Sequence, residues 1–353
     1  MAAEDAKKKG RMSDMGVKSE KFEFHRSFEE LMEGGGLKNV VILGHRNPDG
    51  DAAGCVMGLA HYLKTVYPKY RVIPYLSEKL DKGPKKQVME DAVFDPFALP
   101  ELEERYLAIV CDTATEERIV GRELYDNAAR SIVIDHHASN QGYGTACRIE
   151  ISEACSENVW NMLDWERWKE ASKDRDGQFP KAPDYLYMGI LHDTGGFKRA
   201  KENTMRAALE LWRLGADHKR IMRTMNSMTL DDLKKQAALF DRAERVLDKK
   251  VAYVVLDQEE SRRLGVGYED IHPVSSILRD CEDIEMAFTM YEEEPDMWRC
   301  SFRSDGKWID VNELILPFGG GGHAGAAGLR KRTQDPEGLK NAILEEIEKT
   351  VRN

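Results

Sequence analysis

The chain has 353 residues, of which 41% are hydrophobic and 33% are charged, and its formal net charge is -11 at pH 7. This length allows two domains, and the apolar content is sufficient for a packed core. The acidic balance argues against tight binding of long duplex nucleic acid, which requires a basic surface. No apolar run approaches the roughly 18 residues of a transmembrane helix, so we expect no association with a membrane.

The start of the chain and its cysteines favour a cytoplasmic location. Residues 1–20 are polar and rich in lysine, without the apolar stretch of a secretory signal, and we expect them to form a disordered tail. The six cysteines are scattered, with no Cys-x-x-Cys pair. This distribution is typical of reduced thiols and not of a disulfide framework or a zinc ribbon.

The stretch from His45 to Gly54 is the most informative part of the chain. It contains His45, Asp49 and Asp51, and it lies between an apolar run at 40–43 and a helix predicted over 55–67. A strand-to-helix turn is where a parallel α/β sheet places its ligand-binding side chains. Imidazole and carboxylate groups suit Mn²⁺, Mg²⁺ or Zn²⁺. An Asx-rich turn that only caps the helix is the alternative interpretation.

Two further apolar strands end in residues that can bind metal ions. The run at 107–112 ends in Asp112, and the run at 131–135 is followed directly by His136 and His137. A strand-end aspartate on its own is often only a helix cap. Because the carboxyl ends of parallel strands meet at one edge of a sheet, we expect these side chains to lie together there.

A buried helix predicted over 182–191 supplies a fourth element. It ends in His192 and Asp193, and after Thr194 the glycine pair at 195–196 stops the helix. We interpret Asp193 as a metal ligand, and His192 as a structural histidine or one that supports the ligands.

The second half of the chain has a different texture. A long amphipathic pattern at 229–249 begins at Thr229, a favourable N-cap, and strands are predicted over 251–256, 284–291 and 297–303. Further on, four consecutive glycines at 319–322 precede His323. Such a run allows backbone N–H groups to approach an anion closely.

The motifs at 45–54, 110–114, 133–137 and 192–197, in this order and strand context, resemble the DHH phosphoesterase superfamily. The triplet that names the family is Asp135-His136-His137. The resemblance implies an α/β fold. An N-terminal parallel-sheet domain would carry the catalytic residues, a smaller C-terminal α/β domain would follow, and the active site would lie in the cleft between them.

The second half resembles the DHHA1 domain that accompanies many DHH proteins. Ser301-Phe-Arg303-Ser304 and the glycine-rich segment 320–328 carry this resemblance. It implies that Arg303 and His323 contact substrate, assisted by the backbone of Gly320, Gly321 and Gly322. Together the two resemblances predict a tail at 1–20, a catalytic domain at 21–222, a connecting helix or linker at 223–249 and a substrate-binding domain at 250–353.

The resemblance also implies two bound divalent ions, Mn²⁺ in most members, with Mg²⁺ or Co²⁺ as alternatives. Such a pair can activate water and clamp phosphoryl oxygens. Asp112 would bridge the ions, and His137 and Arg303 would act on the substrate phosphate. One ion would be held by His45, Asp49 and Asp112, and the other by Asp51, Asp112, His136 and Asp193.

Within the superfamily, the architecture is most similar to the stand-alone group of nanoRNases and pAp phosphatases. This similarity implies hydrolysis of very short oligoribonucleotides such as pApA, and of pAp, to nucleoside 5′-monophosphates, by a protein that forms homodimers. Three alternatives stay open, namely a cyclic dinucleotide phosphodiesterase, a pyrophosphatase-like phosphatase and a non-catalytic nucleotide sensor. The chain lacks the Ser-Arg-Lys element that is typical of the pyrophosphatase family, which argues against the pyrophosphatase alternative.

Overall fold

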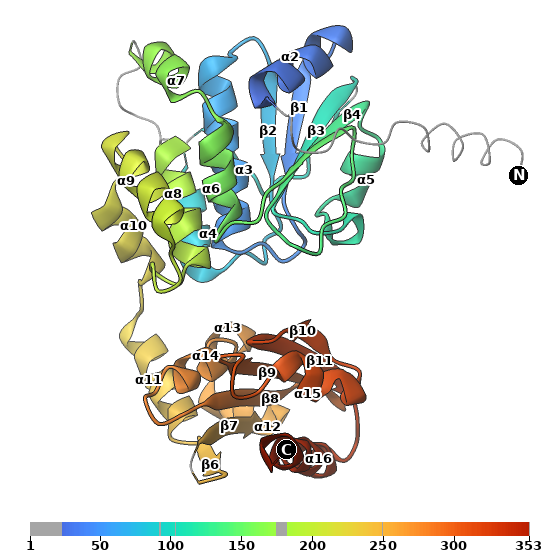
Figure 1. Cartoon of the computed structure of the whole chain (residues 1–353), viewed down its shortest axis with the longest axis vertical. Helices are drawn as coiled ribbons and strands as arrows, with labels where there is room; N and C mark the ends of the chain where they lie inside the picture. The colour runs from blue at the N-terminus through green and yellow to red at the C-terminus, as the bar shows by residue number, and fades with distance from the viewer. Residues whose placement is uncertain (1–22, 92, 103, 174–181, 249, 353) are drawn as a thin grey trace, which may run out of the picture. The chain divides into compact units, whose positions relative to one another are not determined.

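A computed structural model describes residues 23–352, except 92, 103, 174–181 and 249 (Figure 1). The tail predicted at 1–20 lies outside the described residues. The chain divides into two compact units, Met1–Ser227 and Met228–Asn353, which are described separately. The division falls within the range 223–249, where the sequence predicts the connection. None of the helices in the described part of the chain is long and apolar enough to cross a membrane.

The first unit is built on a five-stranded sheet in which every strand pair is parallel. The predicted parallel α/β sheet is therefore confirmed. The strand order is β2-β1-β3-β4-β5. The strands are β1 (Asn39–Leu43), β2 (Arg71–Tyr75), β3 (Tyr106–Cys111), β4 (Arg130–Asp135) and β5 (Ala146–Ile149).

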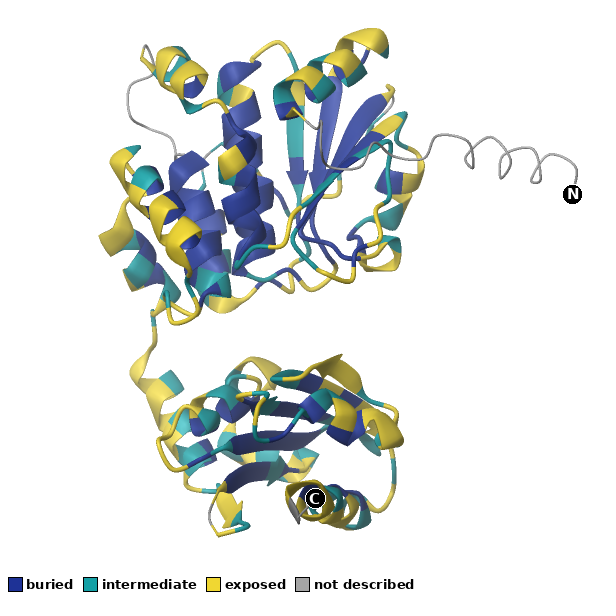
Figure 2. Ribbon diagram, viewed as in Figure 1, coloured by how far each residue is buried: buried dark blue, intermediate teal, exposed yellow. Residues whose placement is uncertain are grey.

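Both faces of this sheet are covered, which explains why its central strands are apolar throughout. In β1, Val40 and Ile42 join the core cluster that includes the helices on one face, whereas Val41 and Leu43 join the cluster on the other face. Figure 2 shows the central strands as buried. The helices of this unit are α2 (Phe24–Gly34), α3 (Gly50–Val66), α4 (Lys82–Met89), α5 (Arg122–Asp126), α6 (Cys155–Met162), α7 (Trp165–Ser172), α8 (Ala182–Asp193), α9 (Glu202–Arg213) and α10 (His218–Met225), with a 3-10 turn η1 at Glu116–Arg118.

Helices α3 and α8 are buried together because glycines let their backbones meet. A Cβ atom on Gly54 of α3 would lie 2.7 Å from the Tyr185 carbonyl oxygen and 2.9 Å from the Gly189 Cα of α8. A Cβ atom on Gly58 would lie 2.8 Å from the Leu186 side chain. The close contact holds the N-terminal turn of α3 beside the C-terminal turn of α8.

The second unit is a mixed α/β domain around a six-stranded sheet of order β10-β11-β9-β8-β7-β6, in which only β7 and β8 pair in parallel among the described strands. Its strands are β6 (Glu244–Val246), β7 (Val251–Leu256), β8 (Met286–Glu294), β9 (Met297–Ser304), β10 (Gly321–His323) and β11 (Ala326–Arg332). Its helices are α11 (Leu230–Phe240), α12 (Gln258–Leu264), α13 (Tyr268–Ile271), α14 (Val274–Arg279), α15 (Val311–Ile315) and α16 (Pro336–Arg352), with a 3-10 turn η2 at Leu316–Phe318.

The structure confirms one local prediction here and revises another. Thr229 caps α11, since its Oγ1 accepts a hydrogen bond from the Asp232 amide at 3.1 Å. The helix ends at Phe240, however, and Glu244–Val246 of the same pattern form β6, which pairs with β7. The end of the glycine run forms the edge strand β10, whose backbone pairs with β11.

We expect Gly54→Ala to destabilise the first unit by about 1–3 kcal/mol, since the added methyl group would force apart two well-packed helices. A fall in the urea midpoint at unchanged slope would measure this loss. Gly34→Ala is the matched control, because a Cβ atom there has nothing within 4 Å. Equal midpoints for the two variants would contradict the close-packing explanation.

Candidate metal centre at the edge of the parallel sheet

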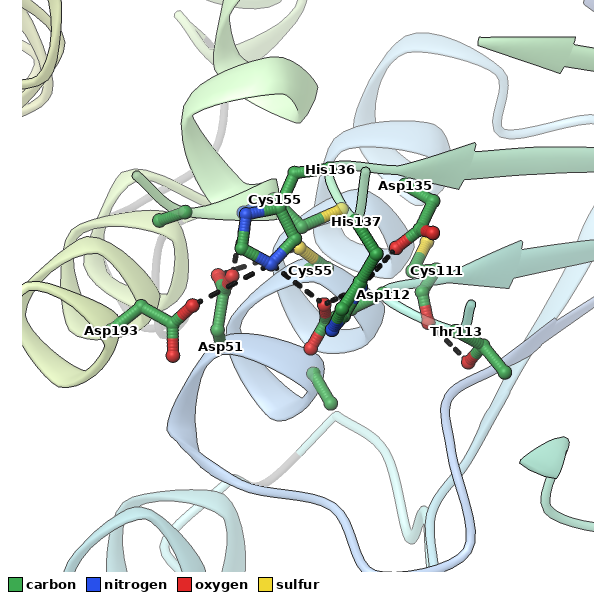
Figure 3. A network of polar contacts seen from close by, with 12 residues as sticks. Asp51, Cys55, Cys111, Asp112, Thr113, Asp135, His136, His137, Cys155 and Asp193 are labelled. Carbon is green, nitrogen blue, oxygen red and sulfur yellow. Dashed lines mark hydrogen bonds and ion pairs between the residues drawn. The ribbon is translucent and has the colours of Figure 1, made fainter. Parts of the chain in front are cut away.

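The structure brings together the side chains that the sequence proposes as metal ligands in the first unit. Figure 3 shows part of this group, with Asp51, Asp112, His136 and Asp193 labelled. Each lies where a strand ends, where a helix begins or where a helix ends. His45 follows β1, Asp49 and Asp51 start α3, Asp112 follows β3, His136 and His137 follow β4, and Asp193 ends α8.

Asp112 occupies the centre of this group. Its Oδ2 lies 3.7 Å from His45 Nε2, and its Oδ1 lies 3.3 Å from His136 Nε2. Its backbone is in the left-handed region, with φ at 51°. Such a conformation is uncommon for residues other than glycine and tends to occur at functional sites. The two carboxylate oxygens therefore face two different histidines, as a bridging ligand requires.

Asp49 both caps α3 and faces the centre, so the two interpretations of the 45–54 stretch are compatible. Its Oδ1 accepts hydrogen bonds from the amides of Asp51 at 2.9 Å and Ala52 at 3.1 Å. Its Oδ2 lies 4.0 Å from His45 Nε2. One oxygen is used for the helix N-terminus and the other is directed at the metal-binding side.

Asp51 is completely buried and is held by the N-terminus of α6. Its Oδ2 accepts a hydrogen bond from the Cys155 amide at 2.6 Å, and its Oδ1 accepts one from the Ser156 amide at 3.0 Å. The N-terminus of a helix stabilises negative charge. This contact fixes the carboxylate, and the sequence offers no signal for it.

The two histidines after β4 are oriented by different partners. His136 Nδ1 lies 3.0 Å from the Ser152 carbonyl oxygen, to which it can donate, so that Nε2 faces Asp112 and lies 3.6 Å from Asp193 Oδ2. A metal-binding histidine commonly has its other ring nitrogen held in this way. His137 Nδ1 lies 2.8 Å from Asp135 Oδ1.

The carboxylates repel one another strongly. Burial raises the pKa of Asp51 well above its ordinary range, and the charges of Asp193 and Asp112 raise it further. Burial also raises the pKa of Asp112. For His136, burial would lower the pKa, but the hydrogen bond to Asp112 and the charge of Asp51 raise it to about 11. A cation bound among these groups would relieve the repulsion.

The donor set fits divalent cations. His45, Asp49 and Asp112 offer ligand atoms within 4.8 Å of one another, as do Asp51, His136 and Asp193. Carboxylate and imidazole donors suit Mn²⁺ and related ions. A third group, Asp49, His192 and Asp193, meets the same distance criterion.

The second unit carries the other proposed substrate contacts. Arg303 on β9 and His323 on β10 both pair with Ala326 on β11, from opposite sides, so their side chains lie on one face of this sheet. The amides of Gly320 and Gly322 donate to the Ile315 carbonyl at 3.1 Å and to Asn312 Oδ1 at 2.8 Å. These two glycines therefore also serve the packing of β10 against α15.

Two family models match the chain. The model described as the DHH family, N-terminal domain, matches residues 39–190, and the model described as the DHHA1 domain matches residues 248–353. The first spans the site from before His45 to just before Asp193. The second spans Arg303 and the glycine run.

Known proteins with related sequences cover most of the chain. The bifunctional oligoribonuclease and PAP phosphatase NrnA of Mycoplasma pneumoniae is 29% identical over 304 residues, which is 82% of this chain and 86% of that protein. The cyclic-di-AMP phosphodiesterase PdeA of Listeria monocytogenes is 23% identical over 334 residues, or 88% of this chain and 46% of that protein. The crystal structure of an exopolyphosphatase-related protein from Bacteroides fragilis has the same fold, with a TM-score of 0.72 at 22% identity over 93% of this chain and 96% of that one.

We expect Asp112→Asn to weaken Mn²⁺ binding by more than about 100-fold. Removing only a residue that hydrogen-bonds to a metal ligand already lowers metal affinity by roughly 10–100-fold, and Asp112 is itself a proposed ligand. Asparagine tolerates the left-handed backbone, so the fold should persist. When a chelator keeps both proteins free of metal, the variant should be at least as stable as the wild type, because the substitution removes one of the repelling negative charges. Titration calorimetry and urea unfolding would measure the two effects, with the exposed Asp126→Asn as control. Wild-type affinity in Asp112→Asn would contradict the central role of Asp112.

We expect Asp135→Asn to lower the pKa of His137 in the metal-free protein. The hydrogen bond to Asp135 raises the pKa of His137 above 6.5, so the imidazolium now persists to higher pH. Without the carboxylate the proton should be lost nearer 6.5, which an NMR titration of the imidazole nitrogens would detect. An unchanged titration in Asp135→Asn would show that Asp135 does not control the charge of His137.

Proposed function

Since the chain belongs to the DHH/DHHA1 family, we propose that it is a two-metal phosphoesterase of the NrnA type. It hydrolyses very short oligoribonucleotides such as pApA, and pAp, to nucleoside 5′-monophosphates. The observation that carries this proposal is the position of Asp112, whose two oxygens face His45 at 3.7 Å and His136 at 3.3 Å, so that it could bridge two ions. The name and the coverage of the NrnA relative support the substrate class.

The proposal assigns the ligands as the sequence does. His45, Asp49 and Asp112 hold one ion, and Asp51, Asp112, His136 and Asp193 hold the other, Mn²⁺ being the cation that suits these donors. Two such ions supply an activated water and charge stabilisation for phosphoryl transfer. The four carboxylates balance the charge of two divalent ions, so further positive groups must bind the substrate phosphate.

His137 and Arg303 supply that positive charge in the proposed reaction. Asp135 orients His137 through a 2.8 Å contact, and this hydrogen bond raises the pKa of His137, which favours the protonated imidazole. Arg303 Nε donates to Ser276 Oγ at 3.1 Å and Nη1 donates to the Phe302 carbonyl oxygen at 2.9 Å, so these contacts orient a planar guanidinium, a group suited to phosphate. His323, in register with Arg303, provides a further contact, with the backbone at Gly320–Gly322 beside it.

A cyclic dinucleotide is the second candidate substrate. The support is the Listeria protein named a cyclic-di-AMP phosphodiesterase, which matches 88% of this chain. The matched region is only 46% of that protein, so the likeness concerns the part that the two share. Linear and cyclic dinucleotides present the same phosphodiester group to the metal centre and differ in the shape that the surrounding pocket must accept.

Three further assignments belong to this proposal. The protein acts as a homodimer, as the family resemblance implies. It works in the cytoplasm, an assignment supported by its six unpaired cysteines. Its substrates are short, because a net charge of -11 opposes the binding of long polyanions.

The decisive test is a Mn²⁺-dependent time course on 5′-labelled RNAs of two to about ten nucleotides, with pAp and cyclic di-AMP in parallel. We expect the fastest turnover on two to four nucleotides and release of monophosphates. Phosphate release from pAp alone would make the protein a nucleotide phosphatase, and a preference for the cyclic substrate would favour the second candidate. No turnover of any of them by the metal-loaded protein would refute the proposal.

We expect Arg303→Lys to lower kcat/KM on a dinucleotide by roughly 10–100-fold, because lysine cannot make the bidentate contact of a guanidinium. The matched control is Arg330→Lys on the neighbouring strand β11, whose guanidinium pairs with Glu293 and Glu294. Mn²⁺ affinity should stay unchanged in both variants. Equal kinetics for both would remove Arg303 from the substrate site.

A further inference from the structure

His192 occupies a space that Gly50 leaves open. A Cβ atom on residue 50 would lie 2.5 Å from His192 Cγ and 2.7 Å from His192 Cδ2, so only glycine permits the imidazole at this position. The ring therefore lies against the turn between Asp49 and Asp51, although His192 comes from the far end of α8. A histidine that is only structural would not need to lie among these carboxylates.

The two ring nitrogens of His192 have different surroundings. Nε2 lies 3.2 Å from Asp81 Oδ2, which is close enough for a hydrogen bond. Nδ1 is buried, lies 3.7 Å from Asp193 Oδ1 and has no hydrogen-bond partner among the described residues. A buried polar atom without a partner requires an explanation.

Asp193 divides its two oxygens between two groups of ligands. Its Oδ2 lies 3.6 Å from His136 Nε2, on the side of Asp51, whereas its Oδ1 faces His192. The ligand atoms of Asp49, His192 and Asp193 all lie within 4.8 Å of one another. Ligands that are each about 2.1 Å from one ion lie about 3–4 Å apart around it. A separation of 3.7 Å therefore suits a shared cation better than a hydrogen bond.

We propose that Asp49, His192 and Asp193 form a further divalent-cation position beside the two that contain Asp112, with Asp81 orienting His192. The position combines two carboxylates with one imidazole, which are donors that suit a divalent cation, and both carboxylates are shared with the two ions of the proposed centre. Asp81 holds the outer nitrogen of the ring, as carboxylates commonly do for metal-binding histidines. The position deepens the proposed two-metal chemistry and rests on it, and it would offer the substrate phosphate an additional positive charge.

The test counts bound ions without any substrate, so its outcome is independent of the nucleotide assays. Mn²⁺ is titrated into the metal-free full-length chain, and the free ion is measured by electron paramagnetic resonance. The main variant is His192→Phe, which fills the space above Gly50 with a ring that has no nitrogen. His218→Phe is the control, because His218 is exposed on α10 and bonds to the Tyr187 hydroxyl at 2.9 Å.

We expect His192→Phe to bind one Mn²⁺ fewer than the wild type, with the remaining affinities unchanged, and His218→Phe to bind the full number. The Asp81 side chain is 58% exposed, so Asp81→Asn should leave the fold intact. This variant should bind the same number of ions as the wild type, but with about 10-fold lower affinity for one of them. An unchanged number and unchanged affinities in His192→Phe would overturn the proposal. The proposal would also be overturned if His192→Phe bound the full number of ions but held one of them with lower affinity. His192 would then serve one of the two positions that contain Asp112.

Discussion

The repulsion among four carboxylates at one edge of a parallel sheet is the constraint on which this structure depends. Asp51 and Asp112 are buried, and burial together with neighbouring negative charge raises the pKa of both. Uncompensated buried charges of this kind are costly. The protein offsets part of the cost by placing the α6 N-terminus on Asp51 and the His45 and His136 imidazoles on Asp112. The electrostatic cost that remains favours the binding of cations. The same repulsion therefore destabilises the metal-free site and gives the site its affinity for metal ions.

Such an arrangement persists only if rigid packing prevents the charged groups from separating. The glycines that join α3 and α8 provide that packing, because they allow two backbones to approach more closely than side chains permit. Gly189 also leaves room for side chains, since a Cβ atom there would overlap Ser156 Oγ and lie 2.7 Å from Asp51 Oδ1. The same glycines thus place Asp51 near the end of α8, where Asp193 lies. The buried charges destabilise the site, and the close packing of α3 against α8 offsets this loss, as is common for functional sites.

Much of this centre can be predicted from the sequence, because strand ends carry it. Apolar runs that stop at Asp112 or before His136 determine which edge of the sheet the side chains reach, and local pattern is sufficient for that. Contacts between distant segments could not be predicted in the same way. No periodicity indicates that two backbone amides of α6 donate hydrogen bonds to Asp51, or that Asp81 contacts His192. Nor does it indicate that Asp112 adopts a left-handed backbone conformation. Nor does the glycine run itself indicate that Gly321–His323 pairs with β11 as an edge strand.

Charge also explains why the two units differ in what they contribute. Metal ions would leave the centre of the first unit close to neutral, and a nucleotide phosphate still needs positive partners. We propose His137 as one such partner in the first unit. Arg303 and His323 lie in one row of the second sheet, on strands whose register fixes their spacing. In the proposed reaction, a substrate with only a few phosphates needs only such a small set of partners. Because the net charge of -11 opposes each additional phosphate of a longer strand, the overall charge agrees with the short substrates that we propose.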